Sequence, residues 1–164
     1  MLQKKICMLG AFSVGKTTLV KRFVDSVFAE NYLTTVGVKI DKKVVNLPDQ
    51  TVNLILWDMA GEDDVATVRM SYLRGMAGYI VVADGTRPST LDVASSLHER
   101  VVADHGLLPF TLLINKHDLL DRWAIADHEL ESLRQRGWSV RTTSARSGEG
   151  VEDAFTEIAA RTSR

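Results

Sequence analysis

Apolar residues fall into short unbroken runs separated by more polar stretches. The runs at residues 6–9, 78–83 and 110–114 predict strands, and the last two are typical of strands covered on both faces of a sheet. Residues 36–47 and 51–57 lie on either side of a Pro-Asp turn. The pattern therefore predicts a sheet with one antiparallel hairpin near its start.

Between these strands, apolar residues recur at the spacing of helices. The stripes that carry this pattern are Val20, Phe23, Val24 and Val27; Leu91, Ala94, His98 and Val101; Ala126, Leu130 and Leu133; and Val151, Ala154, Phe155 and Ile158. We expect His98 to be a packing residue rather than a ligand. With a last strand expected at residues 138–142, the alternation predicts an α/β fold, in which helices flank a mostly parallel sheet of about five to six strands.

Composition agrees with one ordinary domain over residues 1–164. Hydrophobic residues make up 45% and charged residues 25% of the chain, which excludes a disordered or fibrous protein. The formal net charge of -1 provides no general attraction to nucleic acid or anionic lipid. We therefore expect no nucleic-acid partner, and any phosphate must be bound locally.

The single cysteine, Cys7, excludes an intramolecular disulfide and a cysteine-based zinc cluster. No apolar run approaches the roughly eighteen residues of a membrane-spanning helix, so a cytoplasmic location is expected. Leu2 is not the glycine that N-myristoylation needs, and residues 161–164 contain no cysteine to prenylate. We therefore expect no lipid anchor in this chain.

Residues 10–17 match the pattern G-x-x-x-x-G-K-[ST] in full, after a predicted strand and at the start of a predicted helix. Gly10 and Gly15 allow the backbone to curl so that successive N–H groups point inward, where the helix N-terminus adds partial positive charge. Lys16 can reach the β and γ phosphates, and the Thr17 hydroxyl can bind Mg²⁺. The pattern predicts a phosphate-binding loop, and on its own it leaves ATPases, kinases and GTPases open.

Residues 115–118 (Asn-Lys-His-Asp) follow a predicted buried strand and match N-K-x-D. The Asp118 carboxylate can accept hydrogen bonds from both N1–H and the exocyclic amine of guanine. Adenine cannot satisfy this carboxylate, because its N1 is an acceptor and would face a buried charge. Residues 144–146 (Ser-Ala-Arg) resemble an S-A-K loop whose backbone N–H meets guanine O6, with arginine in place of lysine. The two segments together predict specificity for guanine.

These motifs together resemble a small GTPase of the Ras superfamily, most closely of the Rab-type branch, over essentially the whole chain. Residues 32–38 resemble its switch I pattern, residues 56–62 resemble W-D-T-A-G-Q, and residues 71–78 resemble the switch II helix. The resemblance implies the P-loop NTPase fold and the binding of GTP and GDP with Mg²⁺. It also implies effector, exchange-factor and activating proteins that bind through switch I, about residues 28–38, and switch II, about residues 58–75.

The resemblance also implies a role for each residue of the site. The expected nucleotide-binding residues are Gly10, Ser13, Val14, Gly15, Lys16, Thr17, Thr18, Phe28, Thr35, Gly61, Asn115, Lys116, Asp118, Ser144, Ala145 and Arg146. The expected Mg²⁺ ligands are Thr17, Thr35 and, through water, Asp58. Phe28 is expected to lie against the guanine ring, and the Gly61 N–H to contact the γ-phosphate. The expected catalytic residues are Glu62, Lys16 and Gly61.

The sequence departs from the family pattern at Glu62 and Phe12. Glu62 replaces a glutamine that orients the attacking water and donates to the transition state, whereas an ionised carboxylate accepts but cannot donate. A protonated Glu62, or a Glu62 that acts as a base, would affect hydrolysis differently. The sequence therefore does not decide whether Glu62 raises or lowers the hydrolysis rate. Phe12 replaces a small residue and could crowd an incoming arginine finger. We also expect no lipid-bearing tail of the kind that a typical Rab protein uses, a feature that a bacterial or archaeal Ras-like protein would show.

These features predict a molecular switch that hydrolyses GTP, with a low intrinsic rate. The alternative is a nucleotide-binding scaffold that holds GTP with little or no hydrolysis, in which Glu62 and Phe12 are disabling changes. A metabolic phosphotransferase is a third class, and no second-substrate or lid insertion between the motifs supports it.

Overall fold

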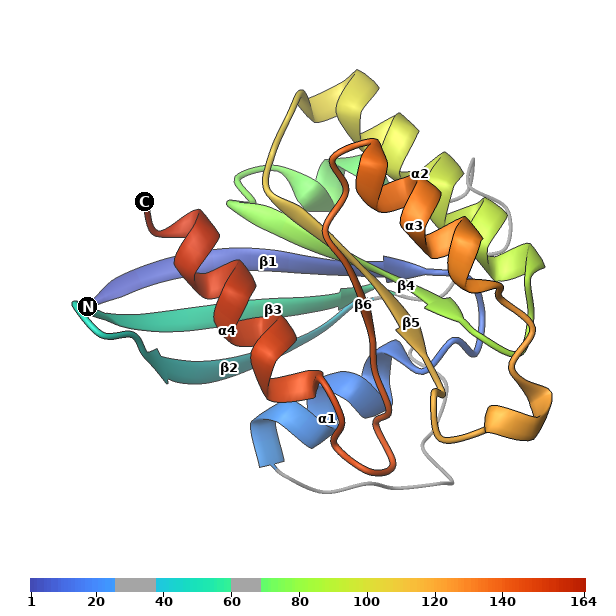
Figure 1. Cartoon of the computed structure of the whole chain (residues 1–164). Helices are drawn as coiled ribbons and strands as arrows, with labels where there is room; N and C mark the ends of the chain where they lie inside the picture. Colours follow the sequence, from blue (N-terminus) through green and yellow to red (C-terminus); the bar gives the residue numbers. More distant parts are fainter. Residues whose placement is uncertain (26–37, 60–68) are drawn as a thin grey trace.

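The computed structural model describes residues 1–25, 38–59 and 69–164. Its strands are β1 (Leu2–Gly10), β2 (Val38–Asn46), β3 (Thr51–Met59), β4 (Gly78–Asp84), β5 (Phe110–Asn115) and β6 (Val140–Thr142). These described strands form one six-stranded sheet in the order β2-β3-β1-β4-β5-β6 (Figure 1). β2 pairs antiparallel with β3, and every other neighbouring pair is parallel, as the sequence predicts.

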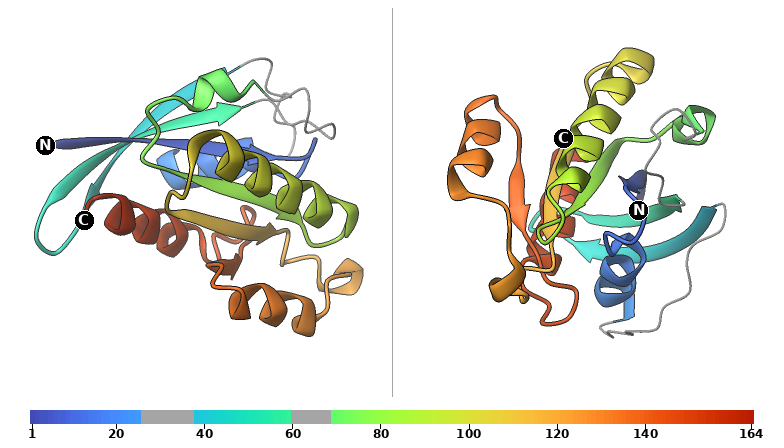
Figure 2. Two further views of the ribbon diagram at one scale, coloured as in Figure 1. Left: turned by 90° about the horizontal axis from the view of Figure 1, so that it is seen from above. Right: turned by 90° about the vertical axis from the view of Figure 1, so that its right-hand side faces the viewer.

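Helices cover both faces of this sheet (Figure 2). Those in the described part of the chain are α1 (Lys16–Asp25), α2 (Ser89–His105), α3 (Asp127–Gln135), α4 (Val151–Thr162) and the short 3-10 helices η2 (Met70–Leu73) and η3 (Leu120–Arg122). α1 and α4 pack on one face, where Phe23 and Phe155 stack with ring centroids 4.2 Å apart. α2 and α3 contribute Leu97 and Leu130 to the core on the other face. None of the described helices is both long and apolar enough to span a membrane.

The unbroken apolar run of β4 is explained by burial on both sides. Every residue of this strand is buried. Because successive side chains of a strand point to opposite faces, Ile80 enters the core beneath α1 and α4, and Val81 enters the core beneath α2 and α3. His98 is a packing residue, as predicted: its ring lies 4.0 Å from that of Phe110, and its Nδ1 is 2.7 Å from the Tyr79 hydroxyl. Burial lowers the pKa of His98.

Several element boundaries differ from the pattern or lie outside the described residues. β1 begins at Leu2 rather than residue 6, because its parallel pairing with β3 continues through polar residues back to the Leu2–Val52 pair. β6 is limited to Val140–Thr142, shorter than the expected 138–142. Residues 27 and 36–37, which were expected to continue a helix and to begin a strand, lie outside the described residues.

The parallel strands bring three loops to one edge of the sheet. β1 ends at Gly10, β4 at Asp84 and β5 at Asn115, and Asp84 and Asn115 are partners in register. The carboxyl ends of these strands lie together on the right of Figure 1. Ligands of parallel α/β sheets bind at this edge, so the fold places all the described sequence motifs where a nucleotide would lie.

Candidate nucleotide-binding site

The phosphate loop, residues 10–17, connects the end of β1 to the first turn of α1. Its backbone has a positive φ at Ser13 (60°) and at Gly15 (98°). A Cβ on Gly15 would lie 2.4 Å from Asn115 Nδ2, and a Cβ on Gly10 would lie 2.6 Å from the Val82 carbonyl oxygen. Both positions therefore require glycine, one for its conformation and both for close contact with neighbouring strands.

Lys16, Thr17 and Asp58 come together beside this loop. The Thr17 hydroxyl donates to Asp58 Oδ2 at 2.6 Å, and Lys16 Nζ lies 3.5 Å from Asp58 Oδ1. Asp58 is completely buried, and Lys16 is only 5% exposed. The structure thus places an ammonium group, a hydroxyl and a carboxylate at the end of β1 and β3. Hydroxyl and carboxylate oxygens are ligands that Mg²⁺ prefers, so this donor set fits the expected metal.

The loop after β5, residues 115–118, is called the base loop. Its first two residues bind the phosphate loop: Asn115 Nδ2 donates to the Val14 carbonyl at 3.0 Å, and Lys116 Nζ donates to the Ser13 carbonyl at 3.1 Å. Asn115 is buried, and its Oδ1 accepts from Thr143 at 3.1 Å. Asn115 and Lys116 therefore hold two loops in a fixed relation, although about a hundred residues separate those loops in the sequence.

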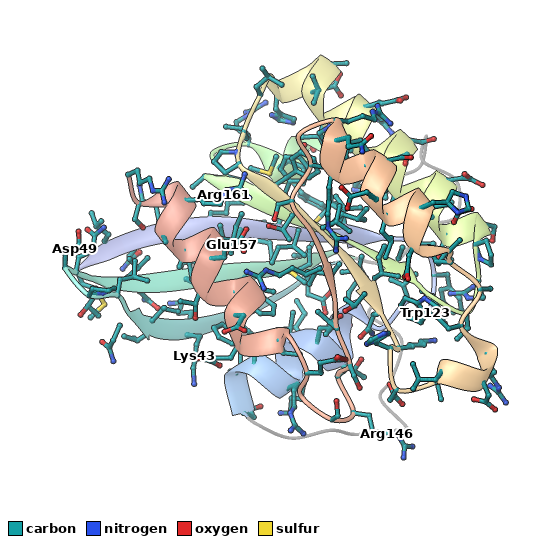
Figure 3. All side chains as sticks on the ribbon, in the orientation of Figure 1. Lys43, Asp49, Trp123, Arg146, Glu157 and Arg161 are labelled. Atoms are coloured by element: carbon teal, nitrogen blue, oxygen red, sulfur yellow. The ribbon has the colours of Figure 1, made fainter. Side chains whose placement is uncertain are left out.

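Asp118 lies against the loop between β6 and α4, residues 143–150, which is called the S-A-R loop. Ser144 Oγ donates to Asp118 Oδ1 at 2.8 Å, and Arg146 Nε lies 3.8 Å from Asp118 Oδ2. Ala145 is buried, whereas the Arg146 side chain points outward from this end of the molecule (Figure 3). The structure thus brings the two segments that the sequence assigns to guanine recognition into direct contact.

Asp84, at the end of β4, is a residue of this region that the sequence motifs did not reveal. Its carboxylate is buried and accepts from Thr86, from Arg87 Nε at 3.1 Å and from Lys116 Nζ at 2.8 Å. Burial raises the pKa of Asp84, but the hydrogen bonds from Lys116 and Thr86 outweigh it and hold the pKa below its ordinary value. Its signal in the sequence is an acidic residue at the end of an otherwise apolar strand.

Phe12, one of the two departures from the family pattern, is 45% exposed on the phosphate loop. Its carbonyl accepts from Arg87 Nη2 at 2.6 Å, so Arg87 joins Asp84 to this loop. Thr18 Oγ1 donates back to the Gly15 carbonyl at 2.8 Å. Side chains at or just after the ends of β4 and β5, and one in the first turn of α1, therefore hold the phosphate loop in place.

Comparison with known proteins identifies the family. Residues 5–164 match the Ras family. The chain belongs to the Ras family. It is 32% identical over 158 residues to the Ras-related protein Rab-1 of Theileria annulata, a match that covers 94% of this chain and 72% of that relative. The Ras-related protein Rab-1 of Theileria parva matches with the same identity and coverage.

These similarities place the chain in the Rab-like branch of the small GTPases, and its sheet is that of a P-loop GTPase. Proteins of the Ras family are GTP-binding switches that bind Mg²⁺, hydrolyse GTP and interact with effectors, exchange factors and activating proteins. Four residues that are expected to bind the nucleotide or to act in catalysis lie outside the described residues: Phe28, Thr35, Gly61 and Glu62.

Proposed function

We propose that residues 1–164 form one G domain that binds GTP and GDP with Mg²⁺, hydrolyses GTP slowly and acts as a molecular switch. The observation that carries the proposal is the connection between the phosphate loop and the base loop. Asn115 and Lys116 donate to the carbonyls of Val14 and Ser13, so the proposed phosphate and guanine sites would lie at one edge of the sheet. A ligand that carries both groups could then contact both loops.

The base loop and the S-A-R loop would select guanine. Asp118 accepts one hydrogen bond from Ser144 and has further acceptor capacity for the N1–H and exocyclic amine of guanine. The Ala145 N–H would donate to guanine O6, and Phe28 would lie against the ring. Asn115, Lys116 and Arg146 would support this set, because each contacts one of the loops or Asp118 itself.

The phosphate loop would bind the nucleotide phosphates through the backbone N–H groups of residues 13–18 and through Lys16. Thr17, Asp58 and Thr35 would hold Mg²⁺, and the oxygen donors that meet in the Thr17–Asp58 pair support this assignment. When bound, Mg²⁺ neutralises negative charge that develops on the phosphate oxygens during phosphoryl transfer. Lys16 and the Gly61 N–H would stabilise the same charge.

Slow hydrolysis follows from Glu62. An ionised carboxylate can accept a hydrogen bond from the attacking water, but it cannot donate to the transition state as a glutamine does. Lys16 nevertheless lies beside Thr17 and Asp58, so one expected catalytic residue is next to two of the expected Mg²⁺ ligands. We therefore expect a real but low intrinsic rate.

A scaffold without useful hydrolysis is the alternative, and Phe12 supports it. This large side chain is 45% exposed on the phosphate loop, and the hydrogen bond from Arg87 to its carbonyl fixes the backbone there. An activating protein that inserts an arginine finger would meet the Phe12 ring. The alternative therefore predicts that activating proteins have little effect on this chain.

Partner proteins would bind through switch I, residues 28–38, and switch II, residues 58–75. The described end of switch II is attached to the body of the protein: Lys5 Nζ donates to the carbonyls of Tyr72 and Arg74 at 2.7 and 2.8 Å. His105 Nε2 also lies 3.2 Å from the Met70 carbonyl. A nucleotide-dependent movement of residues 70–74 would therefore have to break these contacts. The proposed location of the switch is the cytoplasm.

Single-turnover hydrolysis of preloaded GTP separates the switch from the scaffold. We expect phosphate release from the wild-type protein within hours. Glu62→Gln should raise the rate by about tenfold, or about 1.4 kcal/mol of barrier, because it restores a donor. A slower Glu62→Gln variant with a flatter pH profile would instead assign Glu62 as a base. Phe12→Gly is the second variant, and it should matter mainly when an activating protein is present.

Complete absence of phosphate release from the GTP-loaded wild-type protein, with candidate activators present, would contradict the switch and favour the scaffold. Glu152→Gln is a suitable control for the charge change at Glu62, because Glu152 is exposed on α4 and lies outside the expected site. Its hydrolysis rate should equal that of the wild type.

A further inference from the structure

We propose that His117 and Glu149 are a pair of positioning residues that joins the base loop to the S-A-R loop and slows release of the nucleotide. This inference rests on the guanine site of the proposed function. It adds a determinant of nucleotide residence time, because neither residue is among those expected to contact the base.

The His117 ring extends from the base loop to the S-A-R loop. Its Nδ1 lies 2.8 Å from Glu149 Oε2 and 3.0 Å from Glu149 Oε1. Its backbone N–H donates to the Thr143 carbonyl at 3.0 Å, and its ring packs edge-on against Trp123, with centroids 4.8 Å apart. Figure 3 shows Trp123 far from Asp49, which marks the opposite end of the sheet. The backbone contact and the tryptophan together fix the direction of the imidazole.

The pair completes a closed set of contacts around Asp118. Ser144 Oγ donates to Asp118 at 2.8 Å, and the Ser144 N–H donates to the Glu149 carbonyl at 3.0 Å. The Glu149 carboxylate then contacts His117, which directly precedes Asp118. Separation of the two loops would therefore break the His117–Glu149 contact and displace the carboxylate that would recognise guanine.

The other side of the S-A-R loop is held by α1. Arg22 donates to the carbonyls of Arg146 and Ser147 at 3.4 and 3.1 Å. This contact anchors the loop to the helix that follows the phosphate loop, but it does not reach the base loop. Loss of the His117–Glu149 pair would therefore loosen the base side of the S-A-R loop while leaving its attachment to α1 in place.

Solvent limits the strength of the pair. The His117 and Glu149 side chains are 31% and 49% exposed, and ion pairs with such exposure contribute little. The Glu149 carboxylate can only accept, so the ring donates through its Nδ1–H. The pair therefore adds one modest hydrogen bond between the two loops.

The test is the dissociation rate of a fluorescent GDP analogue from the Mg²⁺-loaded protein. His117→Ala and Glu149→Ala should each release the analogue about three- to fivefold faster than the wild type. The double variant should be no faster than either single variant, because the two residues act through one contact.

Two further variants make the result specific. His117→Asn keeps an uncharged donor near the position of Nδ1, so it should restore most of the slow release. His128→Ala removes an exposed histidine of α3 and should leave the rate unchanged. Equal rates for wild type and His117→Ala, or additive effects of the two alanine variants, would overturn the pair while leaving the proposed function intact. Failure of the wild type to bind the analogue would overturn both.

Discussion

Asp118 is the residue on which the proposed selectivity for guanine depends. Its carboxylate accepts from Ser144 at 2.8 Å and is positioned by contacts with the S-A-R loop rather than by burial in the core. Asp118→Asn should weaken GDP binding by about 10- to 100-fold, because two hydrogen bonds to a charged acceptor are lost or reversed. The same change should favour xanthine nucleotides, whose exocyclic group is a carbonyl. Titration with GDP and xanthosine diphosphate checks this, and unchanged GDP affinity would reject the assignment.

Thr17 and Thr35 are expected to bind Mg²⁺ in different nucleotide states. Thr17 Oγ1 donates to Asp58 at 2.6 Å, and both residues lie in described elements that we propose hold Mg²⁺ with either nucleotide. Thr17→Ala should therefore weaken the binding of both GDP and GTP. Thr35→Ala should spare GDP and weaken only the GTP state, because its expected contacts depend on the γ-phosphate. Affinities measured for GDP and a non-hydrolysable GTP analogue distinguish the two, and equal effects on both states would contradict the placement.

Individual site residues differ in how far the sequence could reveal them. Lys16, Thr17 and Asp118 lie in short motifs whose roles follow from local spacing, so the pattern indicates them directly. Asp84 could not be recognised in this way, because its partners Lys116 and Arg87 reach it only after β4 and β5 have paired. Glu149 is a similar case, since its contact with His117 depends on how two loops meet.

At the scale of elements, Asp84 connects β4 to both nucleotide-binding loops. It contacts Lys116 of the base loop, and Arg87 of the same cluster contacts the phosphate loop at the Phe12 carbonyl. Asp84→Asn should lower the free energy of unfolding by about 2 kcal/mol near neutral pH, a value reduced because Lys116 and Arg87 are partly exposed. Urea unfolding measures this change, with Asp49→Asn in the exposed β2–β3 turn as the control.

The loss in Asp84→Asn should depend on pH. The pKa of Asp84 is held below its ordinary value of 3.8 in the folded protein. Its carboxylate therefore contributes stability that is fully present above that value and disappears as the pH falls through the lower, folded-state pKa. The difference between wild type and Asp84→Asn should be constant near neutral pH and should shrink in acid below the ordinary pKa. If the stability difference between wild type and Asp84→Asn grew in acid, it would contradict the lowered pKa of Asp84.

The pattern of apolar residues predicted the elements better than it predicted their ends. The buried runs of β4 and β5 are determined by cover on both faces, which leaves a strong local signal. β6 is short, and the residues around it are held by α4: Ser139 and Arg141 both donate to Glu157. Contacts of this kind join residues from different elements. The local pattern of apolar residues therefore cannot predict where β6 begins.

At the scale of the whole molecule, the sheet order gathers distant segments at one edge. The phosphate loop, the base loop and the S-A-R loop follow strands that end there, and Asp84 is the last residue of such a strand. Asp49 and the β2–β3 turn lie at the opposite end (Figure 3). Hydrogen bonds then connect these segments pairwise, from Asn115 to Val14 and from Ser144 to Asp118. A nucleotide that binds this edge would contact loops that already support one another.

The most direct test of this account is calorimetric titration of the nucleotide-free protein with GDP, GTP, ADP and ATP in the presence of Mg²⁺. The account predicts tight binding of both guanine nucleotides and binding of both adenine nucleotides that is at least about 100-fold weaker, because adenine leaves the Asp118 carboxylate without its donors. Equal affinity for adenine and guanine nucleotides, or no binding of GDP and GTP, would contradict it.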